Sequence, residues 1–522
     1  MNSRQAQIQR IVVTAEQMRR IEGRVFEAGM PVAALMEKVG ELLARRIQAL
    51  YPLGQVAKVG VLVGPGHNGG DALVIARELH FRGYGVILFR PFARLKDLTA
   101  HHAHYADSLG VPSVTEIEAL SDCDFFVDGL FGFGLERPLT GPIATAVNHI
   151  NQLPQPIFSI DLPSGVHTDT GAVLGTAIRA THTACLGLWK RAFLQDQALD
   201  SIGRAELIDF DLPIADIQAV LGDPPTVQRI TPEDAIARLP LPRPAATHKY
   251  KVGHLLLVCG SQQYMGAAIL AGLGASASGV GMLTLAAPAF LKSVLIAQLP
   301  EALILGCPET DQGAIAQLPE GLDLDAYSAI ACGPGLTREA QAAVRAVLSS
   351  ERPLLLDADG LNILADLNPV QTLPQRAAPT VLTPHPGEFK RLFPEITNRE
   401  MDPGQMAQTA AQNSRAVVVL KGARVAIAHP QGQLWFNPES TPALARGGSG
   451  DVLTGLIGGL MAQKSVGAEV DLLLSSAFDA ALSGVWLHAQ AGLLAAQERT
   501  VLGVDPRTLA GYINKIPLGS NN

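Results

Sequence analysis

Short, strand-like apolar runs alternate with helix-length segments along most of this 522-residue chain. Neighbouring parallel strands need a crossover connection, usually a helix, so the alternation predicts an α/β fold with parallel sheets covered by helices on both faces. The predicted strands are KVGVLVG (58–64), VILFR (86–90), DFFVDG (124–129), IFSID (157–161), HLLLVCG (254–260), PLLLDADG (353–360), PTVLTPH (379–385) and AVVVLKG (416–422).

A proline-rich segment interrupts this alternation. Residues 221–248 carry six prolines between Pro224 and Pro244, which suits a stiff, partly extended connector. We therefore predict two domains, at residues 10–222 and 230–518. The first opens with the sequence Thr14-Ala15-Glu16-Gln17, which is typical of a helix start where threonine and glutamine cap each other's backbone N–H groups.

One stretch is apolar enough to imitate a membrane span, because residues 255–291 contain no charged side chain. Several glycines and Pro288 interrupt that stretch. The runs at 255–258 and 282–285 are typical of buried strands, and the small residues of 266–278 indicate a helix packed closely on a sheet. We therefore interpret the stretch as part of a soluble core.

The charge balance argues against nucleic acid as a partner, because 40 Lys and Arg stand against 48 Asp and Glu and no basic block is present. We expect small-molecule partners instead. The five cysteines are widely spaced without a pairing or zinc-binding pattern, which fits a reducing compartment. Because the first residues do not form a signal-peptide pattern, we expect a cytoplasmic enzyme without membrane attachment. We also expect a homo-oligomer.

A glycine-rich turn, GPGHNGGD (64–71), follows the first predicted strand and opens a helix. Free backbone N–H groups and the helix dipole converge at such a junction, where α/β proteins bind anionic groups. The turn is neither a Walker A loop, which needs GK[ST], nor a GxGxxG fingerprint. By itself it predicts either an anion site or only a tight turn.

Two further strand ends carry aspartates followed by glycines, in DGLFGFGLERPLTG (128–141) and IDLPSGVHTDTG (160–171). Parallel strands end at one edge of a sheet, so Asp71, Asp128 and Asp161 are predicted to converge on one crevice. A single aspartate at a strand end is more often a helix or turn cap. Three on successive connections favour a functional site.

These three motifs, in this order and spacing, resemble the epimerase domain of the NAD(P)H-hydrate repair enzymes over residues 12–215. The resemblance implies a Rossmann-like three-layer domain that interconverts the R and S forms of hydrated NADH and NADPH. It also implies a potassium ion (K⁺) held by Asn68, Asp128 and Ser164, whose oxygen atoms suit a hard cation. The implied contacts to the hydrated dinucleotide are His67, Asn68, Gly69, Gly70, Asp71, Gly132, Phe133, Gly134, Leu135, Glu136, Arg137, Pro138 and Asp161.

We predict that Asp161 shuttles the proton while the hydroxyl group leaves C6 of the hydrated nicotinamide ring and adds back. Two positions depart from the family pattern. LMEKVG (35–40) carries Lys38 where LMENAG is usual, and His67 stands where an asparagine is usual.

The most informative motif of the second domain is ARGGSGDVLTGLIGGLM (445–461). Its glycines predict an open turn with outward-facing N–H groups, and Asp451 stands at the start of a helix. The apolar residues from Val452 to Leu460 are predicted to anchor that helix. An anion hole beside a carboxylate base is what phosphoryl transfer from a nucleotide requires.

Five upstream segments run from a strand end into a turn: 249–270, GPGL (333–336), LDADGLN (356–362), LTPHPGEF (382–389) and LKGARVAIA (420–428). With 445–461 they resemble the ADP-dependent NAD(P)H-hydrate dehydratase domain over residues 230–515, which implies a ribokinase-like α/β fold. The implied contacts to the hydrated nucleotide are Ala267, Gly335, His385 and Asp451. The implied contacts to ADP or AMP are Lys421, Gly422, Ala423, Arg424, Val425 and Gly450.

The implied reaction returns the S hydrate to NAD(P)H at the expense of ADP, which yields AMP and phosphate. Asp451 is predicted to deprotonate the C6 hydroxyl group, which attacks the terminal phosphoryl group of ADP, and Mg²⁺ accompanies the ADP. The segment STPALAR (440–446), which ends at Arg446, departs from the TGNPG-type stretch usual in the family.

Other polar residues have two interpretations each. The histidines at 101, 102 and 104 form a metal cluster or, because adjacent helix positions face different directions, a solvated helix, which we favour. His385 is either a ligand contact or a turn residue. Asp357 and Asp359 either cap a helix or bind magnesium or phosphate.

Two functional alternatives stay open. One is a small-molecule kinase with an accessory Rossmann-like binding domain, which leaves a phosphorylated product instead of eliminating phosphate. The other is an N-terminal domain that binds or acts as a scaffold without catalysis. The fusion favours a bifunctional repair enzyme, because one domain would equilibrate the R and S hydrates and the other would consume the S form.

Overall fold

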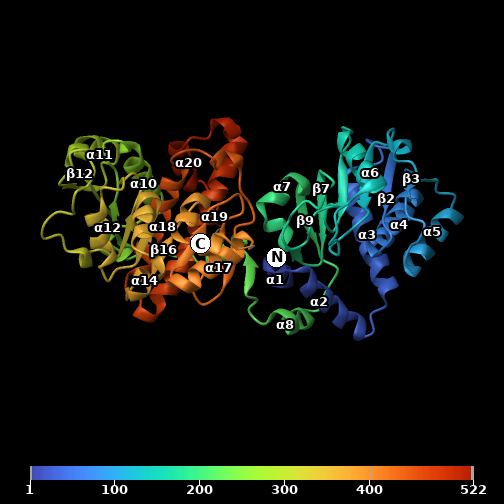
Figure 1. Ribbon diagram of the computed structural model, residues 1–522, viewed down its shortest axis with the longest axis horizontal. Coiled ribbons are helices and arrows are strands. Elements are labelled where there is room, and N and C mark those ends of the chain that lie inside the picture. Colours follow the sequence, from blue (N-terminus) through green and yellow to red (C-terminus); the bar gives the residue numbers. More distant parts are fainter. Residues whose placement is uncertain (1–2, 400, 519–522) are drawn as a thin grey trace. The chain divides into compact units, whose positions relative to one another are not determined.

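The computed structural model describes residues 3–399 and 401–518, and the chain divides into two compact units between Gln228 and Arg229 (Figure 1). The N-terminal unit is built on one parallel sheet. Its strands are β2 (Lys58–Val63), β3 (Gly85–Phe89), β4 (Ser113–Val114), β5 (Phe125–Gly129), β6 (Ile157–Ile160), β7 (His182–Leu186) and β9 (Arg204–Ile208). Their order is β4-β3-β2-β5-β6-β7-β9, and every neighbouring pair is parallel.

Helices cover both faces of this sheet. Val59 and Val61 of β2 belong to one apolar core, whereas Leu62 and Phe126 belong to a second, so successive residues point to opposite faces. Helices α3, α4 and α5 lie side by side along β2 and β3 in Figure 1. The helices of this unit are α1 (Ser3–Arg10), α2 (Ala15–Glu27), α3 (Val32–Leu50), α4 (His67–Phe81), α5 (Asp97–Ser108), α6 (Gly141–Gln152), α7 (Leu199–Ile202) and α8 (Ile214–Leu221).

The strand order reverses between β2 and β5. From β2 the chain moves outward to β3 and β4, and it then returns to β5 on the other side of β2. The loops that leave β2 and β5 therefore diverge at their carboxyl ends, and such a switch point is where open α/β sheets bind ligands. These two loops are GPGHNGGD and the start of DGLFGFG.

A separate two-stranded pair positions α2. Strand β1 (Val12–Val13) lies parallel to β8 (Trp189–Lys190), and Val13 is the register partner of Lys190. The next residue, Thr14, forms the predicted capping box: its Oγ1 accepts from Gln17 N–H at 3.2 Å, and Gln17 Oε1 accepts from Thr14 N–H at 2.9 Å. Helix α2 thus starts directly beside β8.

The C-terminal unit contains a ten-stranded mixed sheet. Its strands are β10 (Val227–Arg229), β11 (His254–Val258), β12 (Met282–Pro288), β13 (Leu303–Cys307), β14 (Ala329–Cys332), β15 (Leu354–Leu356), β16 (Thr380–Leu382), β17 (Val417–Leu420), β18 (Ala426–Ala428) and β19 (Leu434–Phe436). The order is β10-β19-β18-β17-β16-β15-β14-β11-β12-β13, in which β17, β18 and β19 pair antiparallel and the pairs from β17 to β13 are parallel. The order reverses between β11 and β14, which creates a second switch point.

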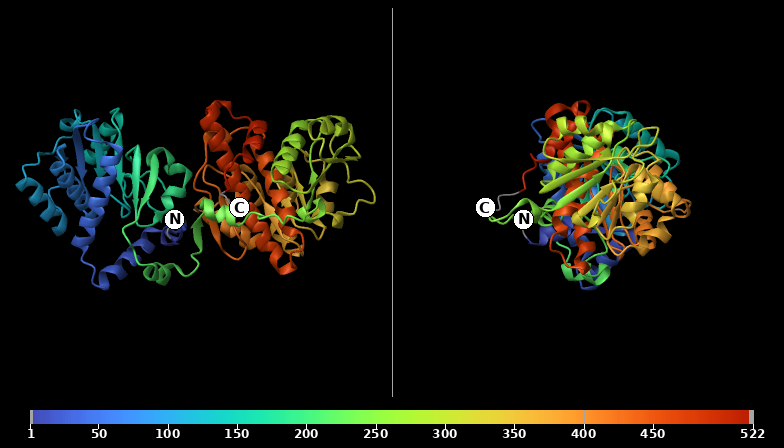
Figure 2. Two further views of the ribbon diagram at one scale, coloured as in Figure 1. Left: turned by 180° about the vertical axis from the view of Figure 1, so that it is seen from behind. Right: turned by 90° about the vertical axis from the view of Figure 1, so that its left-hand side faces the viewer.

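Helices cover this sheet on both faces. Leu255 and Leu257 pack in one core with Leu456, whereas Leu256 is equally buried but lies outside that core. In the left view of Figure 2, the red helices towards the C-terminus lie against the strands. The helices are α9 (Pro232–Ala237), α10 (Met265–Ala277), α11 (Lys292–Gln298), α12 (Gln341–Leu348), α13 (Ala358–Asp366), α14 (Pro369–Thr372), α15 (Pro386–Leu392), α16 (Pro394–Thr397), α17 (Pro403–Ser414), α18 (Ser449–Ser465), α19 (Leu473–Arg499) and α20 (Pro506–Ile513).

One segment of the described chain, Val470–Arg499, is long and apolar enough to cross a membrane by length and composition alone. Most of its apolar residues are buried within the unit, where Trp486 and Leu487 share a core with residues of α18. The stretch 255–291, which also carries no charge, forms β11, α10 and β12 as predicted from its glycines.

All eight predicted sheet strands are present, within one to four residues at each end. The prediction of an extended connector over 221–248 was partly wrong. Residues 227–229 form strand β10, and residues 232–237 form helix α9, whose first turn is capped by Thr231 and Asp234. Ile230 and Ala235 are buried in the core of the C-terminal unit, and this burial overrides the local effect of the prolines.

Helices α10 and α18 approach so closely that the contact requires glycine. A Cβ added at Gly455 would lie 1.8 Å from the carbonyl oxygen of Ala271 and 2.6 Å from the backbone nitrogen of Ala275. We predict that Gly455→Ala destabilises the C-terminal unit by about 1–3 kcal/mol, because the two helices must separate. Hydrogen exchange of α10 and α18 peptides would measure the change.

Gly511 in α20 provides the matched control, since a Cβ there meets nothing within 4 Å. Gly511→Ala should leave exchange unchanged or slow it, because alanine favours a helix by up to about 1 kcal/mol. Equal exchange in the wild type and Gly455→Ala would contradict the close-packing argument.

Candidate functional sites

A cavity of about 560 Å³ opens at the first switch point. It is lined by the loops after β2 and β5, by α2 and α3, and by residues that follow β6 and form β8. Of the predicted contacts it brings together His67, Asn68, Asp71, Gly132, Phe133, Gly134, Leu135 and Asp161. Gly69 and Gly70 lie buried in the first turn of α4, and Glu136, Arg137 and Pro138 line a different depression beside α6.

The turn after β2 depends on Gly69. A Cβ at this position would lie 1.9 Å from the carbonyl oxygen of Gly64, so only glycine lets α4 begin this close to the end of its strand. Helix α4 starts at His67, which places its first free N–H groups and its positive dipole end at the cavity. This geometry is suited to an anionic ligand.

A buried ion pair lies in the cavity wall. Lys190 Nζ is 2.5 Å from Asp161 Oδ1, and their side chains are 0% and 4% exposed. Asp161 also accepts from the backbone N–H of Phe133 at 3.0 Å and of Leu186 at 3.3 Å. Every neighbour bonded to Asp161 is therefore a donor, and the carboxylate acts as an acceptor in this arrangement.

Two further carboxyl groups line the same cavity. Burial raises the pKa of Glu22 to about 7, against an opposing effect of Lys190. Burial also raises the pKa of Asp71 well above its usual value, and the charges of Asp161 and Glu22 add to this effect. The cavity therefore combines one buried cation with three carboxyl groups.

Of the three predicted potassium ligands, Asn68 lines the cavity, whereas Asp128 and Ser164 do not. Asp128 is fully buried and does not line it, so the predicted convergence of three aspartates on one crevice holds only for Asp71 and Asp161. Ser164 Oγ donates to Asp128 Oδ1 at 2.6 Å and accepts from Phe131 N–H at 2.9 Å. Burial raises the pKa of Asp128 despite these bonds.

The donor set fits a hard cation in its chemistry. Asp128 has hydroxyl and backbone N–H donors but no cationic partner among the described residues. The Nδ2 atom of Asn68 is buried without a hydrogen bond. Because the amide nitrogen and oxygen exchange places on rotation, an unpartnered oxygen can occupy this position.

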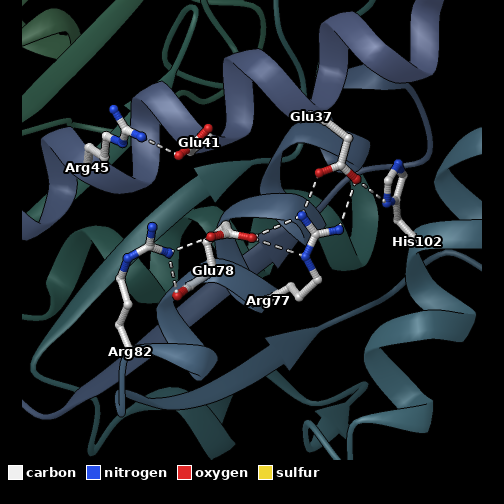
Figure 3. A network of polar contacts seen from close by, with 7 residues as sticks. All are labelled: Glu37, Glu41, Arg45, Arg77, Glu78, Arg82 and His102. Carbon is white, nitrogen blue, oxygen red and sulfur yellow. Dashed lines mark hydrogen bonds and ion pairs between the residues drawn. The ribbon is translucent and has the colours of Figure 1, made fainter.

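Ion pairs hold the apolar wall of the cavity in place (Figure 3). Arg77 of α4 donates to both carboxylate oxygens of Glu37 on α3, at 2.9 and 2.5 Å. Its guanidinium also contacts Glu78 at 3.0 Å. The pair fixes α3, which carries the lining residues Leu35, Met36 and Val39.

The histidines at 101, 102 and 104 lie on helix α5, as the favoured interpretation predicts. His101 and His104 of α5 are exposed, whereas His102 turns inward and its Nδ1 lies 3.8 Å from Glu37. Burial lowers the pKa of His102. Among the residues that the structure describes, no group of three or more His, Cys, Asp or Glu side chains is arranged to hold a metal ion.

The second site surrounds the start of α18. Asp451 lies in the first turn of this helix, as predicted, and the residues from Val452 to Leu460 are buried. Burial raises the pKa of Asp451 to about 7, the charge of Asp357 adds to the effect, and Lys421 opposes it. Asp451 therefore lies at the positive end of a helix with a carboxyl group that titrates near neutral pH.

An ion pair again accompanies the carboxyl group with the raised pKa. Lys421 Nζ lies 2.8 Å from Asp357 Oδ1, and Thr454 Oγ1 donates to Asp357 Oδ2 at 2.7 Å. A Cβ at Gly450 would lie 3.5 Å from Lys421 Nζ, so the ammonium group sits beside the first turn of α18. Lys421, Gly450 and Asp451 thus lie together.

The other predicted residues of this site lie in loops or at helix starts. Gly335 packs on Ala267, because a Cβ at Gly335 would lie 2.8 Å from that of Ala267. His385 caps α15, where its ring accepts from Gly387 N–H at 3.0 Å, and its Nε2 lies 3.4 Å from Glu388. Gly422, Ala423 and Arg424 form the loop after β17, and Val425 packs against the core.

The alternatives for Asp357 and Asp359 can now be separated. Asp357 precedes α13 but its side chain makes no cap; it binds Lys421 and Thr454 instead. Asp359 accepts from Thr337 N–H at 3.0 Å and from the side chain of Asn362 at 3.0 Å, which is a local structural role.

Sequence reasoning missed Glu22, Lys190 and Thr454. The first two come from segments 168 positions apart in the chain, and only the β1–β8 pair brings them to one cavity. Thr454 carried a weak signal, since it follows Asp451 by one helical turn and therefore lies on the same face.

Each of the two units thus has a lysine–aspartate ion pair, an acid of raised pKa and a helix N-terminus beside the carboxyl ends of its parallel strands; the lysine is 0% exposed in the first unit and 21% exposed in the second. This combination defines a two-site α/β enzyme that acts on anionic small molecules.

Comparisons with known proteins agree with this class. A family model described as NAD(P)H-hydrate dehydratase matches residues 255–515, and one described as YjeF-related protein N-terminus matches residues 32–192. The bifunctional NAD(P)H-hydrate repair enzyme Nnr of Thermosynechococcus vestitus is 54% identical over 503 residues, covering 96% of each chain. The enzyme of the same name from Synechocystis sp. is 53% identical over 504 residues, covering 97% of this chain and 94% of that protein.

A crystal structure of the ADP/ATP-dependent NAD(P)H-hydrate dehydratase from Bacillus subtilis, co-crystallized with ATP/Mg2+, is 35% identical. It covers 55% of this chain and 95% of that chain, with a TM-score of 0.45.

The chain belongs to the family of bifunctional NAD(P)H-hydrate repair enzymes. The predicted family, the Rossmann-like and ribokinase-like fold classes, and the pairing of an epimerase with an ADP-dependent dehydratase are confirmed. The kinase and scaffold alternatives are accordingly not favoured.

His488 contacts the start of α18 at the second site and makes the stability of the folded chain sensitive to acid. Its Nε2 lies 3.0 Å from the carbonyl oxygen of Ser449, the first residue of α18, and burial lowers the pKa of His488 to about 4. Between pH 6.5 and 4 the unfolded chain therefore binds a proton that the folded chain does not. The contribution of neutral His488 to the free energy of unfolding is fully present above pH 6.5. It falls by about 3 kcal/mol as the pH approaches 4.

We predict that His488→Gln reduces this acid-induced loss of stability, as measured by denaturant unfolding at pH 7, 5.5 and 4.5. His104→Gln, at an exposed histidine of α5, is the control and should retain the wild-type pH dependence. An unchanged pH dependence in His488→Gln would contradict the assignment.

Proposed function

We propose that residues 10–222 form the NAD(P)H-hydrate epimerase domain and residues 230–518 the ADP-dependent dehydratase domain. The observation that carries this division is that each unit has its own acid of raised pKa beside its own lysine–aspartate ion pair. The small-molecule substrates would be hydrated NADH or NADPH in both units and ADP in the second. We also propose a cytoplasmic homo-oligomer.

In the epimerase domain, the hydrated dinucleotide would occupy the 560 Å³ cavity. The N-terminus of α4 would receive the pyrophosphate, since its free N–H groups and dipole favour anions. Asp161 would exchange a proton with the C6 hydroxyl group as it leaves and returns, and Lys190 would hold Asp161 in place. The proposed contacts are His67, Asn68, Gly69, Gly70, Asp71, Gly132, Phe133, Gly134, Leu135, Glu136, Arg137, Pro138 and Asp161.

We propose that Asn68, Asp128 and Ser164 hold a potassium ion. Their donors are oxygen atoms, which suit a hard cation, and the buried Asp128 carboxylate has no cationic partner in the described chain. When bound, the ion would offset the charge of Asp128 and brace the loops after β2, β5 and β6. Ser164, whose hydroxyl donates to Asp128, would turn this donor away and present its lone pairs.

In the dehydratase domain, Asp451 would remove the proton of the C6 hydroxyl group of the S hydrate. The C6 oxygen then attacks the terminal phosphorus of ADP, and AMP leaves. The lone pair of the ring nitrogen next expels phosphate from C6, and loss of a ring proton gives NAD(P)H. Since Asp451 acts as a base, this activity should rise with pH through about 7.

The residues around Asp451 suit the nucleotide. Lys421 is the cation beside the first turn of α18, and the N–H groups of that turn can stabilise charge on the transferred phosphoryl group. Mg²⁺ would arrive on the phosphates of ADP and neutralise part of their charge. Lys421, Gly422, Ala423, Arg424, Val425 and Gly450 are the proposed ADP contacts, and Ala267, Gly335, His385 and Asp451 are the proposed contacts to the hydrate.

We predict that Asp451→Asn lowers ADP-dependent loss of the S hydrate by about 10²–10⁴-fold, because the general base is lost. Equilibration of the R and S forms should continue at the wild-type rate, since it belongs to the other unit. The two rates can be measured by chromatography of the hydrates with and without ADP. Dehydration within a few-fold of wild type would contradict the role of Asp451.

We predict that Asp128→Ala slows equilibration of R and S hydrates and weakens its dependence on potassium. ADP-driven dehydration of pure S hydrate should not change, because it belongs to the other unit, and unchanged hydrogen exchange of peptides from β2 and β3 would show that the N-terminal unit of the variant is folded. An exposed acid of the same unit, Glu118, supplies the control Glu118→Ala. If Asp128→Ala leaves equilibration and its potassium response unchanged, Asp128 has only a structural role.

A further inference from the structure

The epimerase cavity holds an acid that the proposed mechanism does not use. Glu22 of α2 lines the cavity, and its carboxyl group makes no hydrogen bond or ion pair with another described residue. Asp161 differs, because its oxygens already accept from Lys190, Phe133 and Leu186. Asp161 is thus arranged to accept a proton, whereas Glu22 is free to carry one.

The fold places Glu22 beside that ion pair. The register pair of Val13 with Lys190 and the cap at Thr14 set the start of α2 against β8. Ala15 N–H also donates to Asp169 at 2.7 Å, and Arg24 is bonded to Asp216 on α8 at 2.9 Å. Helix α2 is therefore fixed at both ends, and it cannot turn Glu22 away from the cavity without breaking these contacts.

The surroundings favour a protonated Glu22 at neutral pH. Apolar side chains line the same cavity as Glu22, among them Phe26, Leu35 and Phe133. The charged or titratable groups that face it are Lys190 from β8, Asp161 after β6, Asp71 and His67 from α4, Lys96 before α5 and Arg19 from its own helix. Burial outweighs the nearby cations, and the resulting pKa of about 7 leaves the acid about half protonated at pH 7.

A second proton-carrying group would let the epimerase use one group for departure of the hydroxyl group and Asp161 for its return. The R and S hydrates carry the hydroxyl group on opposite faces of the nicotinamide ring, so water that leaves one face must add to the other. Departure requires an acid that protonates the hydroxyl oxygen, and re-addition requires a base that takes a proton from water. Asp161, a carboxylate held by Lys190, supplies the base but not the acid.

We propose that Glu22 is a catalytic residue of the epimerase, the acid that complements Asp161. This role rests on the proposed function of the N-terminal unit. Glu22 gives its proton to the C6 hydroxyl group, the C6–O bond breaks, and the lone pair of the ring nitrogen forms a C=N⁺ bond. Water then adds to C6 from the other face, Asp161 takes its proton, and the electron pair returns to nitrogen. Proton transfer from Asp161 back to Glu22 completes the cycle, and the reverse reaction exchanges their roles.

The test uses Glu22→Gln in the full-length protein, with hydrate enriched in the R form, no ADP and potassium present. After the uncatalysed rate is subtracted, we expect kcat for equilibration to fall about 10²-fold or more. The KM should change less than three-fold. Wild-type kcat should decline as pH rises through about 7, because Glu22 loses its proton, and this decline should vanish in Glu22→Gln. Glu22→Asp should recover part of the rate, which a purely structural residue would not do.

Glu27→Gln, at an exposed position of the same helix, is the matched control and should behave as wild type. Unchanged hydrogen exchange of peptides from β2 and β3 would verify that the N-terminal unit of each variant is folded, and ADP-driven dehydration of pure S hydrate should also stay unchanged. The proposal is wrong if Glu22→Gln keeps kcat within three-fold, keeps the alkaline decline, or raises only KM. A wild-type protein without any R–S equilibration would instead refute the proposed function of the N-terminal unit.

Discussion

Both units depend on one property of parallel sheets, namely that all strands end with their carboxyl ends at the same edge. Where the strand order reverses, between β2 and β5 and again between β11 and β14, two loops diverge and leave space that no crossover helix fills. Functional residues can lie at strand ends because polar side chains there are outside the apolar cores that cover both faces of the sheet. The backbone at Gly69 lies so close to that of Gly64 that no side chain fits between the end of β2 and the start of α4.

Burial of charge gives both sites the same electrostatic pattern. In each, a lysine is bound to one aspartate, Lys190 to Asp161 and Lys421 to Asp357, and a neighbouring acid has a pKa near 7. A buried ion pair costs desolvation energy and adds little stability by itself, so its presence at both sites favours a functional reason. Burial raises the pKa of the free acid at both sites, the aspartate of the pair adds to this rise, and the lysine opposes it.

Much of the fold could be predicted from sequence because local patterns and tertiary packing agree. The run LLLV at 255–258 is buried on both faces, as its lack of alternation indicates, and Thr14 forms its capping box with Gln17. Prediction failed where packing overrides composition. The six prolines between Pro224 and Pro244 suggested an extended connector, but the apolar side chains of Ile230 and Ala235 join a core, and residues 232–237 form a short helix.

A site residue could be predicted from the sequence only where it lies next to a glycine-rich strand end. Asp451, Asp161 and Lys421 carry that signal, whereas Glu22 lies within an ordinary amphipathic helix and Lys190 in a two-residue strand. Their function arises from the pairing of β1 with β8, a contact over a long sequence separation that no local pattern encodes.

The two chemistries complement each other thermodynamically. Epimerisation only equilibrates R and S hydrates, so it has no driving force of its own, whereas cleavage of ADP makes consumption of the S form effectively irreversible. Removal of S displaces the equilibrium, and mass action draws the R form through the first site. This coupling works through the free hydrate concentration and requires no channel or fixed arrangement of the units. What it does require is that both acids work at one pH, and a pKa near 7 at both Glu22 and Asp451 meets that condition.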